Sequence, residues 1–338
     1  MNKYKIERVT KEKYTDKKWQ KYFEFRTVCA KKKKSKLHLK TWEELKDEAY
    51  GYLKRGMGIY TIKKNGMEAG HFYFGLRDKN KKKKRFVYLT HHFINKSIDN
   101  TLLKLIVKEF LKYDNNAHFL AIPSRNGDHD YIGKRLKADI GTNQIHLELK
   151  KKDVKKKVIN KWVKTYSKKF PDLTMKFYED IPDELLKEYC KVFTELLVNM
   201  PANSELSDHN VRPAAIRRWD KHDKKNNRTS YRYLVFNKDN KLIAKTNVAL
   251  NKDKPQSMHQ YMTGVLKEYR EQGIGKWMKG VMYLKLEKDF PDYEVIKTET
   301  HPENHGSKSI SLQMGYKQVA TLKEFKVSRE KSEAFLKK

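Results

Sequence analysis

The chain has 338 residues, enough for two domains of ordinary size. Hydrophobic residues make up 38% and charged residues 35%, so the chain is able to build cores beneath a polar surface. No run approaches the roughly 18 apolar residues that a membrane span needs, so no span is expected.

The net charge is +34, from 76 Lys and Arg against 42 Asp and Glu. Basic blocks stand at 31–34, 81–85 and 150–157. Such an excess attracts anions, which leaves nucleic acid, an acidic membrane surface or an acidic substrate open as partners. The alternative is a set of solvated lysine-rich loops. The dominance of lysine favours this alternative, because a dedicated phosphate reader more often uses the bidentate fork of arginine.

The cysteine and histidine content indicates neither a disulfide nor a metal site. Cys29 and Cys190 fall on separate predicted helices and are expected to be small core residues of a cytosolic protein. No Cys/His cluster has zinc-ligand spacing, and the adjacent His91 and His92 would point to opposite faces of a strand. Residues 1–7 lack the apolar core of a signal peptide, so we expect a cytoplasmic protein without a metal.

The first half of the chain alternates between strand and helix patterns. In chain order we expect a strand at 4–9, helices at 19–30 and 42–53, a hairpin of 59–62 and 71–76 around Asn65-Gly66, a strand at 86–93, a helix at 101–113, a strand at 119–122, a short helix at 131–136 and a strand at 144–149.

The second half repeats that order more clearly. We expect a strand at 173–178, helices at 182–200 and 211–221, a hairpin of 231–236 and 242–250, a strand at 261–265, a helix from 274, a strand at 293–300, a short helix through 310–314 and a strand at 317–327. The repeated order predicts an internal duplication. Between the halves, apolar residues spaced among lysines predict an amphipathic linker helix at 151–171 that packs across both domains.

The most informative motif is a glycine-spaced turn ahead of a helix, in which Arg270, Gly273 and Gly275 form the pattern R-x-x-G-x-G. A strand, a glycine turn and a helix together offer free backbone N–H groups and a helix dipole to a phosphate. The dinucleotide fingerprint does not fit because no third glycine follows, and the P-loop does not fit because Trp277 replaces its Ser or Thr. Taken alone, the motif is also compatible with a plain tight turn.

A second motif lies about thirty residues further on, where Thr298, Asn304, Gly315 and Tyr316 match T-x5-N-x10-G-[FY]. Together the two motifs resemble the GCN5-related N-acetyltransferases over about residues 230–320. The resemblance implies an α/β (α+β) chain with two tandem acyl-CoA N-acyltransferase folds, as in mycothiol-synthase-like enzymes. Each fold is a mixed, largely antiparallel twisted sheet flanked by helices.

The resemblance also implies acetyl-CoA as acyl donor, an amine as acceptor and no metal. The loop would bind the pyrophosphate of acetyl-CoA, and the strand before it would open to hydrogen-bond the pantetheine arm. The implied donor-binding residues are Thr263, Gly264, Val265, Arg270, Glu271, Gln272, Gly273, Ile274, Gly275, Lys276 and Asn304. Backbone N–H near Val265 would stabilise the oxyanion.

The two copies differ where this chemistry would lie. In the first copy the loop position is occupied by residues 92–100, which contain no glycine. We therefore expect a degenerate domain at 1–150, the linker at 151–171 and the catalytic domain at 172–338.

Four residues are candidates for catalysis: Asn304, Glu299, Ser311 and Tyr316. Many relatives carry a tyrosine as general acid four residues before the glycine of G-[FY]. Here that position is Ser311, a poorer acid, so Ser311→Ala is expected to cost little. Glu299 is a candidate base, and surface or capping roles stay open for it. Tyr316 takes a place that is usually in the core.

Further candidates are less well fixed by the motifs. Glu303 is a second candidate base, His301 either relays a proton or caps a strand, and Tyr261 and Tyr283 are other possible acids. The acceptor would lie against the loop 199–209, with Glu205 and Asp208, and the helix after it.

Three functions stay open at this point. The first is acetyl transfer from acetyl-CoA to a small-molecule or protein amine. The second is a Fem-type aminoacyl-tRNA-dependent transferase, which also pairs two such folds and would suit the +34 charge. The third is a non-catalytic RNA- or ribosome-binding module. The intact loop at 270–275 favours the first.

Overall fold

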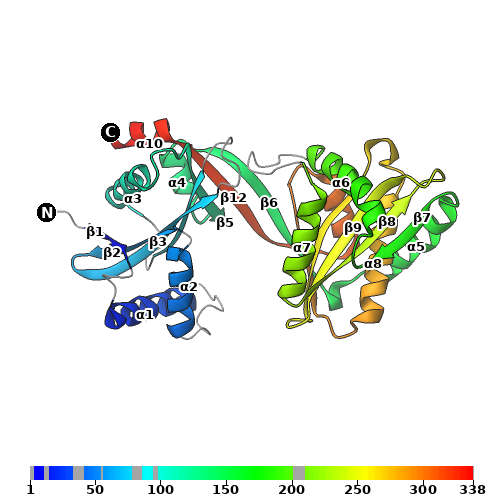
Figure 1. Ribbon diagram of the computed structural model, residues 1–338, viewed down its shortest axis with the longest axis horizontal. Helices are drawn as coiled ribbons and strands as arrows, with labels where there is room; N and C mark the ends of the chain where they lie inside the picture. The colour runs from blue at the N-terminus through cyan, green and yellow to red at the C-terminus, as the bar shows by residue number, and fades with distance from the viewer. Residues whose placement is uncertain are drawn as a thin grey trace. The chain divides into compact units, whose positions relative to one another are not determined.

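The computed structural model describes residues 4–10, 15–32, 42–54, 56–77, 86–93, 98–200 and 210–337. They form two compact units, Met1–Gly141 with Lys323–Lys338, and Thr142–Leu322. Figure 1 shows the elements of both. The first unit contains β1 (Tyr4–Val9), α1 (Asp16–Lys32), α2 (Trp42–Lys54), β2 (Gly58–Lys64), β3 (Met67–Arg77), β4 (Phe86–Phe93), α3 (Asn100–Tyr113), β5 (Phe119–Arg125), α4 (Asp130–Arg135) and the start of β6 (Asp139–Lys150).

The second unit continues from β6. It contains α5 (Lys156–Lys169), β7 (Thr174–Tyr178), α6 (Asp183–Val198), α7 (Pro213–Lys225), β8 (Arg228–Phe236), β9 (Leu242–Asn251), β10 (Ser257–Val265), α8 (Ile274–Asp289), β11 (Val295–Thr300), α9 (His305–Met314) and the first half of β12 (Lys317–Ser328). The chain then ends in the first unit with α10 (Arg329–Lys337). Each predicted element is present within a few residues of its expected bounds, and α10 was not predicted.

The two units repeat one strand pattern, which confirms the predicted duplication of the fold. In the first unit β1, β2, β3 and β4 pair antiparallel in sequence order, and β4 then pairs in parallel with β5. In the second unit β7, β8, β9 and β10 do the same, and β10 pairs in parallel with β11. In both copies the parallel pair is joined by a helix, α3 or α8, as parallel strands require.

The compact units differ from the domain boundaries expected at 150 and 172. Strand β6 pairs antiparallel with β11, so its residues 145–150 belong to the second unit. In the strand order β12 follows β5, and its end from Lys323 belongs to the first unit. The last strand of each copy therefore completes the sheet of the other copy. The pattern of a strand in sequence does not show which neighbour it will pair with.

Helix α5 confirms the predicted amphipathic helix but belongs to the second unit. Its buried residues Ile159 and Trp162 share a hydrophobic cluster with Met282 and Leu286 of α8. The helix is therefore part of the core of that unit, whereas the sequence predicted a linker shared by two domains.

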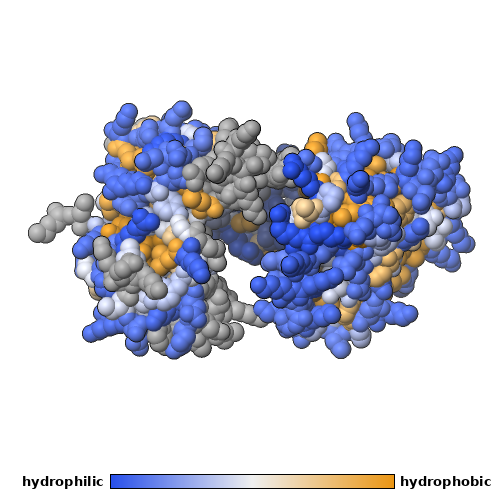
Figure 2. Space-filling view, viewed as in Figure 1, coloured by the Kyte–Doolittle hydropathy of each residue, from blue (hydrophilic) through white to orange (hydrophobic). Residues whose placement is uncertain are grey.

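The sheet of the second unit is covered on two faces by different helices (Figure 1). Helices α6 and α7 cover the cluster around Leu234, Phe236 and Leu242. Helices α5, α8 and α9 cover the cluster that contains Leu147, Val248 and Ile296. The two faces follow from the alternation of side chains along each strand. In Figure 2 the surface on the viewed face is mostly hydrophilic, with small apolar areas between charged side chains.

Several predictions concern parts of the chain outside the described residues. They are the basic block at 81–85, residues 33–34 and the side chains of residues 31–32 in the block at 31–34, the side chains of Cys29, His91 and His92, the loop residues 94–97 of the first copy, and the loop 201–209 with Glu205 and Asp208. Cys190 is described, and it is buried with a free thiol. Within the described residues, no helix is long and apolar enough to cross a membrane.

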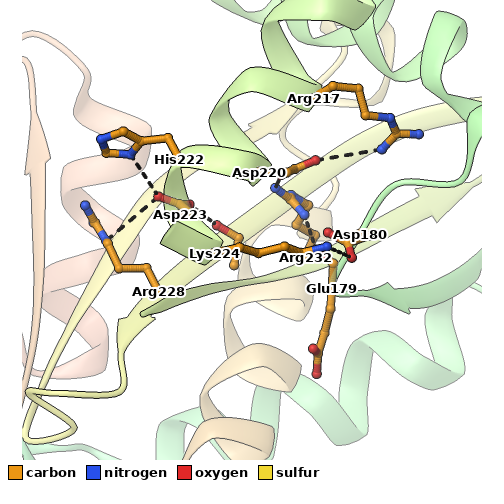
Figure 3. A network of polar contacts seen from close by, with 10 residues as sticks. Glu179, Asp180, Arg217, Asp220, His222, Asp223, Lys224, Arg228 and Arg232 are labelled. Carbon is orange, nitrogen blue, oxygen red and sulfur yellow. Dashed lines mark hydrogen bonds and ion pairs between the residues drawn. The ribbon is translucent and has the colours of Figure 1, made fainter. Parts of the chain in front are cut away.

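A buried ion pair fixes α7 on the sheet (Figure 3). Arg232 of β8 and Asp220 of α7 are 2.5 Å apart, and both side chains are less than a tenth exposed. Arg232 also donates to the backbone carbonyl of Glu179, and Lys224 pairs with Asp180 at 2.7 Å. In the Arg232–Asp220 pair each side chain provides the hydrogen-bond partner that the other needs beneath the helix.

Asp220→Ala is expected to lower the free energy of unfolding of the second unit by about 3–5 kcal/mol, because it leaves the Arg232 guanidinium buried without its counter-charge. Asp223→Ala is the matched control. Asp223 lies on the same helix with its side chain 23% exposed, so its loss should cost less than about 1 kcal/mol. Denaturant unfolding measures both. Equal effects of the two substitutions would contradict the special role of the Asp220–Arg232 pair.

Candidate active site

The predicted glycine turn begins α8 in a left-handed conformation. Gly273 is the N-cap residue of the helix, with φ +104° and ψ 1°. Its carbonyl accepts from Trp277 N–H at 3.0 Å, so the N–H groups of residues 274–276 precede the first intrahelical bond. Because glycine has no side chain that caps these amides, they are available to an external anion.

The turn is held in place from two sides. Arg270 Nε donates to the carbonyl of Val265 at 3.0 Å, which ties the turn back to the end of β10. Lys169 of α5 donates to the carbonyl of Gln272 at 3.0 Å. A Cβ placed on Gly273 would lie 2.1 Å from the ring of Tyr166 in α5. Glycine is therefore required at 273 both for its backbone angle and for the approach of α5.

Gly275 has a different environment. A Cβ there would meet only Cδ1 of Ile310 in α9, at 3.4 Å. This is close to an ordinary contact, so the protein itself accepts a small side chain at 275. Packing within the chain therefore does not require glycine at 275. The absence of a side chain there instead leaves room for a ligand beside the start of α8, near α9.

The strand before the turn separates from its parallel neighbour. Strand β10 pairs with β11 only where Ser257–His259 face Val295–Lys297, and its pairing with β9 has an irregular register between Gln260 and Thr263. Beyond His259, the edge of β10 that faces β11 has no strand partner in the described part of the chain. Such an edge is free to hydrogen-bond an extended ligand.

The irregularity in β10 is maintained by a buried side-chain network. The amide of Gln260 donates to the Asn247 carbonyl at 2.8 Å and to Thr246 Oγ1 at 3.1 Å. The hydroxyl of Thr263 lies 2.8 Å from that of Thr246. Gly264 allows α6 to pack close to the strand, because a Cβ at 264 would lie 2.7 Å from the Leu196 side chain. The Thr263 hydroxyl is thus engaged inside the sheet, and Gly264 is needed for helix packing.

The equivalent helix of the first unit begins in another way. Asp99 is the N-cap of α3, and its carboxylate accepts from Leu102 N–H at 2.9 Å. The same carboxylate accepts from the Tyr4 hydroxyl at 2.6 Å. A negative side chain therefore already occupies the N-terminus of α3, whereas α8 has no capping side chain.

Ser311 is fully buried in α9, and its hydroxyl is already bonded. It donates to the Ser307 carbonyl at 3.0 Å and accepts from Lys279 Nζ at 3.0 Å. Lys279 lies one helical turn beyond Gly275 and is only 4% exposed. Burial lowers the pKa of its ammonium group to about 8. Sequence reasoning missed Lys279, although a lysine between Met278 and Met282 on an apolar helix face was a visible signal.

Glu299 lies in a polar cluster where β10 and β11 part. Its carboxylate is 3.0 Å from His259 Nε2 and 3.8 Å from His146 Nδ1. Burial alone would raise the pKa of Glu299, but the hydrogen bond from His259 and the charges of both histidines outweigh it and lower that pKa. A carboxylate with a lowered pKa is a weak base. The position of the Glu299 carboxylate suits a role in orienting the His259 ring. That ring lies 4.4 Å from the ring of Tyr261.

The other predicted residues have structural partners. Asn304 caps α9 by accepting from Ser307 N–H at 3.2 Å. Tyr316 lies in the core beside Tyr293 and Met314, and burial raises its pKa. Burial also raises the pKa of Tyr283, whose hydroxyl donates to Glu287 at 3.0 Å. No group of ligating side chains in the described residues would hold a metal ion.

A cavity of about 400 Å³ opens between α6 and the start of α7, in the region expected to receive the acceptor. Three of its lining residues are cationic: Lys187, Lys191 and Arg212. Cys190 and Thr194 line the side of α6.

Solved structures share this architecture over nearly the whole chain. A tandem GNAT protein from the clavulanic acid biosynthesis pathway has a TM-score of 0.62 at 12% identity, covering 96% of this chain and 98% of that one. A GCN5-related N-acetyltransferase from Sphaerobacter thermophilus has a TM-score of 0.61 at 8% identity, covering 97% and 96%. A glucosamine N-acetyltransferase region of a fungal β-N-acetylglucosaminidase has a TM-score of 0.56 at 11% identity, covering 96% of this chain and 38% of that one.

Comparison by sequence gives no such likeness: neither the family models nor the curated proteins contain a match. At these identities the likeness establishes the fold. The chain therefore has the tandem GCN5-related N-acetyltransferase fold, as the two sequence motifs predicted.

Gly273→Ala is expected to lower the melting temperature markedly. The change forces a side chain onto a φ of +104° and against Tyr166, and strain of this kind costs about 1–3 kcal/mol before the clash is counted. Gly275→Ala is the control and should change stability by less than about 1 kcal/mol. Thermal unfolding of both variants measures this. A Gly273→Ala variant as stable as the wild type would contradict the close contact between Tyr166 of α5 and the turn.

Lys279→Met is expected to stabilise the protein below pH 8. The ordinary lysine pKa of 10.5 falls to about 8 in the fold, so the unfolded chain holds the proton more tightly. Wild-type stability should therefore rise as pH increases from 8 to 10.5, by at most about 3 kcal/mol. The advantage of the methionine variant should vanish over the same interval. Denaturant unfolding at several pH values tests this, and parallel stability profiles for the two proteins would contradict it.

Proposed function

We propose that the second unit is an acetyl-CoA-dependent N-acetyltransferase, which transfers the acetyl group to a primary amine of a small molecule or protein by direct attack. The observation that carries this proposal is the start of α8. There a left-handed glycine leaves backbone amides uncapped, and Gly275 leaves space beside them. The fold shared with named acetyltransferases supports the same reaction class.

The residues present fit the acyl donor. The amides of residues 274–276 and the positive end of α8 would hold its pyrophosphate, with Arg270 and Lys276 nearby in sequence. The free edge of β10 would hydrogen-bond its pantetheine arm. From Tyr261 to Val265 this edge is about 16 Å long, a length that suits an extended arm. When bound, acetyl-CoA supplies an activated thioester.

The chain's own residues provide the proton transfers. His259, oriented by Glu299, accepts a proton from the amine at the point where β10 and β11 part. Lys279, held by Ser311, supplies a proton to the leaving sulfur, because its lowered pKa makes it a better acid than an ordinary lysine. Ser311 then acts as the hydrogen-bond partner of Lys279, which agrees with a small expected effect of Ser311→Ala. Backbone N–H near Val265 stabilises the oxyanion.

The cavity between α6 and α7 suits an acceptor that carries an anionic group besides its amine. Lys187, Lys191 and Arg212 would attract that group to the cavity. Asn304 stays a proposed contact of the donor, at the start of α9.

Calorimetry with acetyl-CoA is expected to show one site per chain, because α8 is the only helix in the described residues that begins at a glycine without a capping side chain. Gly275→Val should lower the affinity for acetyl-CoA by more than about tenfold and leave the melting temperature unchanged, since the larger side chain occupies the space beside the amides of residues 274–276. Asn100→Val is the matched control at the first residue of α3, and it should bind as the wild type does. Undiminished binding by Gly275→Val, or two equivalent sites, would refute the proposed assignment.

A further inference from the structure

Helix α5 presents two opposite faces. Its inward face carries Ile159 and Trp162, which are buried against α8. Its outward face carries Lys157, Lys161, Lys164 and Lys168, all of them exposed. The spacing of four, three and four residues places these lysines within about 60° of one another around the helix, directly opposite the buried side. We refer to these four residues as the lysine row.

No acidic side chain in the described part of the chain neutralises the lysine row. Among the described residues, none of the four forms an ion pair or a side-chain hydrogen bond. The neighbouring lysines are engaged: Lys156 pairs with Glu287 at 2.7 Å, and Lys169 donates to the Gln272 carbonyl. The sequence of α5 contains no acidic residue.

An unpaired row of this kind carries a cost. Like charges three and four residues apart destabilise a helix by about 0.2–0.5 kcal/mol for each pair. A glutamate at any of these positions would instead form stabilising pairs with the neighbouring lysines. Solubility of a helix face does not require four lysines in a row without an acidic residue. A row of cations along one line does match a partner whose negative charges also lie along a line.

We propose that the lysine row binds the phosphate backbone of a nucleic acid. The row extends for about 16 Å along the helix axis, and one strand of a duplex presents a phosphate about every 3.4 Å along its axis. Trp162 is buried and Tyr166 packs under Gly273, so the row offers no exposed ring for stacking on bases. Binding should therefore depend on charge and be independent of base sequence.

The same geometry disfavours an acidic membrane as the partner. A helix that lies on a membrane inserts an apolar face into the lipid. In α5 the apolar face is buried in the core of the second unit, and the exposed residues are all polar or charged. The proposal does not depend on the acetyltransferase activity, since the row lies outside the residues assigned to that site.

The test measures binding of the full chain to a fluorescent 20-base-pair DNA duplex, a duplex RNA of the same sequence, and vesicles of phosphatidylserine and phosphatidylcholine. In the test variant K157Q, K161Q, K164Q and K168Q are combined. In the control, K225Q, K238Q, K241Q and K254Q remove the same charge from exposed sites elsewhere in the second unit. Melting curves show whether both variants are folded.

For the wild type we expect duplex binding whose log Kd depends steeply on log salt. The test variant should lose about four units of that slope and at least about 100-fold in affinity at low salt, whereas the control variant loses only a few-fold. The DNA and RNA arms show which nucleic acid is preferred, and preference for either supports the proposal. It would be overturned by equal losses in both variants, by the absence of duplex binding, or by vesicle binding that alone depends on the row.

Discussion

The contact between Gly273 and Tyr166 is the constraint on which the second unit's site depends. With no Cβ at 273, the ring of Tyr166 reaches the backbone, and α5 packs along α8 through Trp162 and Ile159. The same left-handed residue sets the direction in which α8 leaves the turn, and so the direction of its uncapped amides. One backbone conformation therefore couples the core of this unit to its proposed anion site, because any side chain at 273 would disturb both.

The two copies of the fold illustrate how a small local difference separates similar structures. Both place a helix between the strands of a parallel pair, and both helices begin at the same topological position. In the first copy Asp99 supplies a carboxylate that caps α3, so the helix start is satisfied internally. In the second copy Gly273 leaves the start of α8 without a capping side chain. That the first copy is a degenerate domain stays a prediction, and the Asp99 carboxylate at the start of α3 supports it because it disfavours a second negative charge there.

Buried lysines are unusual in a protein with so many solvated ones. Lys279 has one hydroxyl partner, and Lys245 lies beneath α6 with its ammonium 3.4 Å from the ring centroid of Phe193. Burial lowers the pKa of both. An apolar residue of similar size would stabilise each position more, since desolvating an ammonium is costly. Perturbed groups of this kind concentrate at functional sites, which is the reason for giving Lys279 a chemical role.

The sequence by itself determined the order of the elements, the duplication and the glycine turn, because periodicity, turn residues and the spacing of Arg270, Gly273 and Gly275 are local properties. Only the tertiary structure decided which strands pair: the exchange of β6 and β12 depends on contacts far apart in the chain. It also brought Lys279 to Ser311, and His259 to Glu299, from separate helices and strands. Such pairs depend on packing, and packing leaves no fixed spacing in the sequence.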